Sequence, residues 1–256
     1  MLIVISPAKS LDTETPAVYT NFTLPEMTEQ SEKLVKRLKT MSPKQLSALM
    51  GISAELGELN FKRFQQWQLP FTTENAKQAI FIFNGDVYQG LQAKTLPAEL
   101  LELAQTRLRI LSGLYGVLRP LDLMQPYRLE MGTKLKYLRA DNLYEFWNPA
   151  ITKKINEAVA QSGSGVLVNL ASNEYFKSID LKKLKAKVVT PEFRELKNGK
   201  YVMVSFFAKR ARGLMTRFAL ENNITNPAEL EAFDVEGYVF NPRLSKPESP
   251  VFTREQ

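Results

Sequence analysis

The sequence predicts a mixed α/β protein, because two short apolar segments typical of buried strands accompany long stretches of helical periodicity. Residues 2–5 and 166–170 are almost entirely aliphatic, as strands buried on both faces are. Between about 26 and 107, apolar residues recur at helical spacing instead. This combination favours a central mixed sheet surrounded by helices.

The first predicted strand, 2–5, leads into a polar loop at 6–10 that contains Ser6 and Lys9. Ligands of α/β proteins favour the carboxyl ends of strands, so this loop is a candidate site. Residues 11–25 have little periodicity and are predicted to be irregular. The apolar start is too short for a signal peptide, and no segment approaches the ~20 apolar residues of a membrane span. We therefore expect a cytoplasmic protein without membrane contact.

Helices are predicted to dominate up to residue 107. One ends near Met41, and Ser42-Pro43 supplies an N-cap and a first-turn proline for the next. Others are expected from about 53, from about 73 and from Pro97, with glycines breaking the pattern near 85 and 90.

The second half is predicted to alternate between strands and helices. Residues 109–112 suit a short strand or a helix end, a helix covers about 149–160, and a polar loop follows the strand at 166–170. Asn198-Gly199 predicts a hairpin with strands near 186–195 and 201–208, before a helix at 208–222. The proline-rich tail after about 240 is expected to cap the domain or to be partly mobile.

Composition excludes several classes of protein. The 256 residues contain neither cysteine nor histidine. Disulfides, thiolate nucleophiles, zinc fingers, Ser–His–Asp triads and the usual haem site are therefore ruled out. Any general base must be Asp, Glu, Lys or Tyr. No cofactor or metal site is predicted. The net charge of +7 suits a polyanionic partner, although a basic protein without such a partner has the same composition.

The positive charge is concentrated in residues 170–220, where twelve basic and four acidic residues leave an excess of +8. The lysines at 182–187 suit a solvated face. Lys209, Arg210, Arg212 and Arg217 lie where a strand is expected to pass into a helix. So many cations there indicate a bound anion such as phosphate, unless glutamates elsewhere pair with them.

A second cationic set lies in glycine- and proline-broken chain. The set is Arg107 or Arg109 with Arg119 and Arg128, and Tyr115 and Tyr127 lie close to it in sequence. This pattern suits phosphate contacts and base stacking, and it suits ordinary packing equally. The hairpin of a helix-hairpin-helix DNA-binding module is one interpretation of the same region, and a plain glycine turn is the other. Its candidate hairpin residues are Ser112, Gly113, Leu114, Tyr115 and Gly116.

Three predicted loops end in polar or charged residues: Ser6 with Lys9, Ser172 with Asn173 and Glu174, and Lys209 with Arg212. Because strand ends converge in α/β proteins, we expect the three loops to meet in one cleft, although separate loops would have the same sequence.

Five sequence blocks resemble the YaaA peroxide-stress-resistance family, and the resemblance spans nearly the whole chain. The blocks are Ser6–Lys9, Leu111–Asp122, Pro126–Gly132, Asn169–Tyr175 and Phe207–Gly213.

The resemblance implies a single compact domain over 1–256, of unusual topology, with a positively charged cleft and a helix-hairpin-helix-like element. It also implies a role in peroxide stress that limits iron-dependent damage, and double-stranded DNA as the partner of a protein expected to be monomeric. The family's DNA contacts are carried over to Lys9, Arg119, Arg128, Lys209, Arg210 and Arg212.

DNA binding through phosphate contacts is accordingly the leading hypothesis, and it requires no catalysis. Arg109 and Arg217 complete its set of candidate phosphate-binding residues. The alternative is an enzyme acting on a phosphorylated or nucleotide-like small molecule in the same cleft, with Lys9, Ser172 and Glu174 as catalytic candidates. A deep narrow pocket would favour the enzyme, and a long open groove would favour DNA.

Overall fold

The computed structural model describes residues 1–255, and it centres on a five-stranded sheet of order β4-β3-β1-β6-β7. Four strands run parallel, while β4 is antiparallel to β3 at one edge. The strands are β1 (Leu2–Ile5), β3 (Leu108–Ser112), β4 (Gly116–Leu118), β6 (Val166–Leu170) and β7 (Lys187–Val189). The mixed α/β fold that the sequence predicts is confirmed.

The central strand β1 is fully buried, which is why its sequence is aliphatic without alternation. It pairs with β3 on one side and β6 on the other, so that Ile3 lies between Leu108 and Val168. The polar residue in β6, Asn169, accepts a hydrogen bond from the backbone N–H of Ala171 at 3.0 Å and so stabilises the turn that ends the strand.

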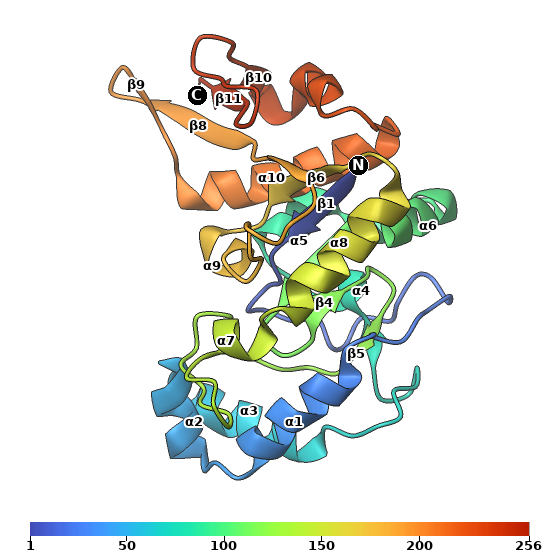
Figure 1. Cartoon of the computed structure of the whole chain (residues 1–256), viewed down its shortest axis with the longest axis vertical. Coiled ribbons are helices and arrows are strands. Elements are labelled where there is room, and N and C mark those ends of the chain that lie inside the picture. Colours follow the sequence, from blue (N-terminus) through green and yellow to red (C-terminus); the bar gives the residue numbers. More distant parts are fainter. Residues whose placement is uncertain (256) are drawn as a thin grey trace.

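Helices surround this sheet (Figure 1). The N-cap expected at Ser42 is confirmed at the second helix of the chain, since Ser42 and Gln45 form a capping box there. The helices are α1 (Thr28–Lys39), α2 (Pro43–Met50), α3 (Ala54–Gln66), α4 (Ala79–Ile82), α5 (Asp86–Leu91), α6 (Ala98–Arg107), α7 (Leu143–Trp147), α8 (Ala150–Ser162), α9 (Asn173–Phe176) and α10 (Ser205–Glu221), with 3-10 turns at Ala93–Thr95, Pro227–Ala232 and Val235–Gly237.

A second sheet of order β10-β11-β8-β9 lies at the opposite end of the molecule from α1, α2 and α3 (Figure 1). It consists of β8 (Glu192–Lys197), β9 (Lys200–Val202), β10 (Val239–Phe240) and β11 (Val251–Arg254). The predicted hairpin joins β8 and β9, and Asn198 and Gly199 both take positive φ, 51° and 72°. The tail is part of this sheet, because β11 pairs with β8 and buries Val251 and Phe252.

Three predicted elements differ in the structure. The strand expected near 186–195 is divided between β7 of the five-stranded sheet and β8 of the second sheet. The helix expected from about 73 is replaced by a two-stranded pairing of β2 (Lys77–Gln78) with β5 (Leu123–Met124) and by the single turn α4. All four residues of α4 are buried, so its apolar spacing reflects burial on every side rather than one helix face. The strand expected over 201–208 stops at Val202, because α10 already begins at Ser205.

The helix-hairpin-helix interpretation of 111–119 is also corrected. Residues 108–118 form a β-hairpin in which β3 and β4 pair, and Gly116 takes φ 68°. Gly113 is needed because a Cβ there would lie 2.2 Å from the carbonyl oxygen of Leu129. Two helices joined by a short glycine turn occur elsewhere: α2 and α3 are connected by residues 51–53, with Gly51 at φ 61°.

Among residues 1–255, no helix combines the length and the apolar character needed to span a membrane.

Candidate functional site

The candidate site lies where the strand order of the five-stranded sheet reverses. The neighbours of β1 in the sheet are β3 on one side and β6 on the other. The strand that follows β1 in this sheet is β3 and the strand that follows β6 is β7, so the chain continues from β1 and from β6 toward opposite edges of the sheet. Such a switch point is the usual ligand site of open α/β sheets. The loops that follow β1 and β6 contact each other directly, since the backbone N–H of Ser172 donates to the Ser6 Oγ at 2.8 Å.

A cavity of about 310 Å³ opens at this switch point. Its lining includes residues from all three segments that were predicted to meet, so their convergence is confirmed, although Lys209 and Arg212 lie within α10 rather than in a loop. Asn173, which was grouped with these loops, is exposed and does not line the cavity. The lining residues that bear on its chemistry are Ser6, Lys9, Asp86, Tyr88, Glu130, Ser172, Glu174, Tyr175, Lys209 and Arg212.

Close packing of α10 against α5 brings two of the cations to this cavity. A Cβ on Gly213 would lie 1.8 Å from the carbonyl oxygen of Val87, and one on Gly90 would lie 2.2 Å from that of Arg210. Only glycine permits this approach of two helix backbones. The final glycine of the sequence block 207–213 is therefore a packing residue that positions the cations before it.

Arg212 carries a charge that no other group offsets. It lines the cavity and forms no side-chain hydrogen bond or ion pair with any residue in 1–255. Burial alone lowers the pKa of its guanidinium, which is the effect of removing a cation from water without supplying a counter-ion. Lys209 lies one turn earlier on α10, is exposed, and also lacks an ion pair within 1–255. An anion in the cavity would satisfy both.

The third cation at the cavity, Lys9, is already paired. Its Nζ lies 2.8 Å from Glu130 Oε2, and the other oxygen of Glu130 lies 3.1 Å from Arg128 Nη2. One carboxylate thus holds two of the cations that were predicted to contact phosphate. Lys9 and Arg128 therefore share Glu130 as their counter-ion.

Carboxylates also face the cavity, and sequence reasoning identified only one of them. Glu174 was predicted, and its Oε1 accepts a hydrogen bond from the backbone N–H of Gly132 at 2.9 Å. Glu130 and Asp86 were missed, and Asp86 makes no side-chain hydrogen bond within residues 1–255. The helix start at Gly85-Asp86 was the available signal, because an acidic residue is favoured in a first turn.

These carboxylates do not form a metal centre. Within the described chain, no group of three or more Asp or Glu side chains is arranged to hold a metal ion. The cavity combines anion-binding and hydrogen-bond-accepting groups. It can hold a ligand that carries both an anionic group and hydroxyl or amino groups.

The other predicted cations lie away from the cavity. Arg119 pairs with Asp122 at 2.9 Å and with Glu26 at 3.4 Å, in a small charged cluster beside α8. Arg109 is buried in the same cluster, where it donates to the backbone carbonyls of Gln105 and Leu108.

Arg210 and Arg217 project from other faces of α10. The Nε of Arg210 lies 3.0 Å from Glu236 Oε1, and the Nε of Arg217 lies 2.8 Å from Glu221 Oε1. The predicted cluster of four is therefore divided. Ion pairing holds Arg210 and Arg217, whereas Lys209 and Arg212 face the cavity.

The two tyrosines of the second cationic set are core residues. Tyr115 accepts a hydrogen bond from the Trp67 indole at 3.0 Å, and Tyr127 lies 2.6 Å from the hydroxyl of Ser112. Their rings pack edge to face at 5.2 Å. Burial raises the pKa of both phenols above their usual value. Ordinary packing, rather than base stacking, explains both residues.

Comparison with known proteins gives a consistent result over the whole chain. A family model described as "Peroxide stress protein YaaA" matches residues 1–244. UPF0246 proteins of Hahella chejuensis and Pseudoalteromonas translucida are each 54% identical to the chain, and one of Neisseria meningitidis is 52% identical. Each alignment covers 100% of this chain and at least 99% of the relative.

Proposed function

This chain belongs to the peroxide stress protein YaaA family, and on that premise we propose that it binds DNA, with Arg212 and Lys209 as the principal phosphate contacts. Membership of the family supports a role in peroxide stress. The proposal adds the partner and the residues that hold it.

The observation that carries the proposal is the uncompensated charge of Arg212 at the switch-point cavity. A partly buried guanidinium without a carboxylate partner is unfavourable in the free protein. A phosphate group would relieve this cost through charge-assisted, bidentate hydrogen bonds, which a guanidinium forms readily. The Lys209 ammonium, one helical turn away, is placed to contact the same or the next phosphate.

Unpaired cations outside the cavity would strengthen the attraction. Of the twelve basic residues in 170–220, four form ion pairs, and those are Lys183, Arg194, Arg210 and Arg217. The remaining eight form none within residues 1–255 and supply a long-range field that attracts a polyanion. The eight are Lys177, Lys182, Lys185, Lys187, Lys197, Lys200, Lys209 and Arg212, of which Lys209 and Arg212 line the cavity and the other six do not.

The size of the cavity limits how DNA can bind. A volume of about 310 Å³ is close to the lower end for small-molecule sites. A duplex would therefore lie across the opening and present a backbone phosphate to Arg212. Contacts of this kind carry little sequence information, so affinity should depend steeply on salt and weakly on sequence.

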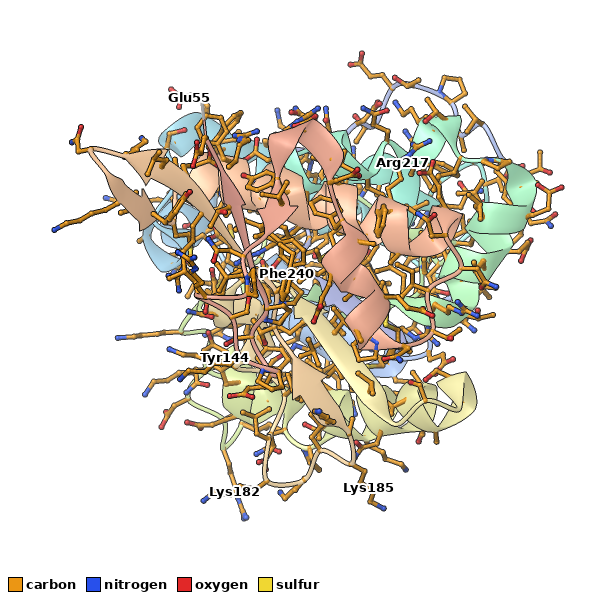
Figure 2. The ribbon with its side chains drawn as sticks, turned by 90° about the horizontal axis from the view of Figure 1, so that it is seen from above. Glu55, Tyr144, Lys182, Lys185, Arg217 and Phe240 are labelled. Carbon is orange, nitrogen blue, oxygen red and sulfur yellow. The ribbon has the colours of Figure 1, made fainter. Side chains whose placement is uncertain are left out.

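The test is a titration of labelled duplex DNA at several salt concentrations. Replacing Lys209 and Arg212 together by alanine should weaken binding at least tenfold and make the salt dependence shallower by up to two phosphate contacts. The matched control replaces Lys182 and Lys185 by alanine, which removes the same charge from two side chains that do not line the cavity and that project from the lower edge of the molecule in Figure 2. Equal losses in the two variants, or affinity that does not change with salt, would contradict the proposal.

A second candidate function is catalysis on a phosphorylated or nucleotide-like small molecule, and the shape of the cavity favours it. The site is a compact, partly open pocket of about 310 Å³, and carboxylates line it together with Arg212. Glu174 would then serve as general base, with Ser172 and Lys9 beside it.

Thermal shift with nucleotides examines this second candidate. A ligand that binds the native state raises the melting temperature by mass action. If nucleotides stabilise the wild type but not the Lys209/Arg212 double variant, the result supports the hypothesis of a small-molecule substrate. If none of them shifts the transition at millimolar concentration, it fails.

A further inference from the structure

An exposed apolar patch lies beside the cavity, next to the phosphate contacts proposed at Lys209 and Arg212. Val202, Met203 and Phe206 expose 40%, 58% and 53% of their surface. They occupy the end of β9 and the first turn of α10, and β9 is an edge strand of the second sheet. Large apolar side chains exposed together in this way mark an interaction surface more often than chance allows.

The aromatic member of this patch is aligned with the phosphate contacts. Phe206, Lys209 and Arg212 follow one another at intervals of three residues along α10. Side chains three apart on a helix are neighbours, with Cβ atoms roughly 5–6 Å apart. The row runs from the exposed ring of Phe206, past Lys209, to Arg212 in the cavity.

The ring of Phe206 is held in place from one side. It packs against Phe207 with the centroids 5.5 Å apart and the planes at 69°. Phe207 is fixed in turn by the Arg254 guanidinium, which lies 4.7 Å from its centroid. An anchored aromatic ring with an exposed surface is suited to stacking against a planar ligand group.

We propose, on the basis of the function proposed above, that this row is a site for an unpaired nucleotide, with the base stacked on Phe206 and the phosphate held by Lys209 and Arg212. Stacking on an aromatic ring beside cations is how proteins bind single strands without sequence preference. A paired base cannot offer its face in this way, because its neighbours in the duplex cover it. The preferred form of DNA is therefore one with unpaired nucleotides.

The charge around the patch favours nucleic acid over a protein partner. Lys197, Lys200 and Lys209 flank the apolar residues, are exposed, and form no ion pair within residues 1–255. A hydrophobic protein partner would have to bury these ammonium groups or leave them at its rim. A polyanionic strand would neutralise them.

The experiment compares binding of a labelled single-stranded oligonucleotide and of a duplex of the same length. Phe206→Ala should weaken single-strand binding about tenfold, which corresponds to ~1.4 kcal/mol and lies within the range for loss of one stacked base. Duplex affinity should change little, and Phe206→Trp should retain single-strand affinity. The matched control is Leu181→Ala, which removes a side chain that is 60% exposed outside the patch and should affect neither ligand.

The failures of the two proposals are distinguishable. If Phe206→Ala leaves single-strand affinity unchanged, or weakens both ligands equally, the stacking site is refuted. DNA binding through Arg212 stands in that case if the Lys209/Arg212 variant still loses duplex affinity. If adenosine monophosphate displaces the oligonucleotide with comparable affinity, the site belongs to a free nucleotide and the assignment to unpaired DNA is overturned.

Discussion

At the scale of single residues, Arg212 is where stability and ligand binding conflict. Its guanidinium is partly buried without a counter-ion among residues 1–255, and this burial lowers its pKa. Lys9 and Arg210 differ, because Glu130 and Glu236 offset their charges. An unpaired cation at this position does not favour stability. Binding of an anion would explain why the position is occupied by arginine.

Replacing Arg212 by methionine tests this conflict. The apolar side chain of similar length removes the desolvation cost, so the free energy of unfolding should rise by about 1 kcal/mol while DNA affinity falls. Urea denaturation and DNA titration of the same preparation measure the two effects. A variant that is both less stable and fully able to bind would show that Arg212 is an ordinary structural residue.

At the scale of elements, the site depends on how closely α10 approaches α5. Gly213 and Gly90 lie at the contact, and each faces a backbone carbonyl of the other helix. This contact sets the position of Lys209 and Arg212 relative to the loops after β1 and β6. It also explains why Gly213 follows the cations Lys209 and Arg212 on α10.

Gly213→Ala should separate the two helices. The added Cβ would meet backbone atoms that cannot rotate away, at a cost of roughly 2–3 kcal/mol, and phosphate binding should weaken because the cations shift. Gly163→Ala is the control, since a Cβ there meets nothing within 4 Å and the positive φ of 70° costs only about 1 kcal/mol. Melting curves and DNA titration should show the larger loss in both properties for Gly213→Ala.

At the scale of the molecule, the C-terminal tail is an integral part of the second sheet, because β11 pairs with β10 on one side and β8 on the other. Phe252 on β11 is fully buried and stacks on Phe193 of β8 at 5.7 Å between centroids. The same sheet packs against α10, whose other side lies on α5 beside the central sheet. We therefore predict that the chain unfolds as one cooperative unit.

Phe252→Ala tests this prediction. Truncating a fully buried phenylalanine should cost about 3–5 kcal/mol. In a single domain, the whole melting transition shifts to lower temperature in one step. Two transitions by calorimetry, with only one of them shifted, would indicate that the second sheet is a separate unit.

Much of the fold was predictable because local rules decide it. The aliphatic strands at 2–5 and 166–170, the capping residues Ser42 and Pro43, and the Asn198-Gly199 hairpin all follow from short-range preferences. The errors arose where burial on every side removes periodicity. The turn α4 and the hairpin after β3 are surrounded by core, so spacing carried no information about their form.

The candidate site shows the same division. The strand-end loops that carry Ser6 and Ser172 could be expected to meet, since strand direction fixes where such loops emerge. Lys209 reaches the same cavity from α10, which follows a strand of the second sheet. Which cations would stay unpaired could not be predicted. Consecutive residues of a helix, such as Lys209 and Arg210, point about 100° apart. Whether a carboxylate lies within reach of each side chain depends on residues distant in sequence, as Glu236 is from Arg210.

The sequence by itself determined the mixed α/β class, the chemistry that is absent and the loops that carry polar residues. Only the tertiary structure decided that Glu130 pairs with Lys9, that Glu236 pairs with Arg210 and that no carboxylate in the described part of the chain pairs with Arg212 beside the cavity. The physical reason is that helix, strand and turn preferences depend on residues close together in sequence. Electrostatic pairing depends on distance in space, which the chain fixes only when it has folded.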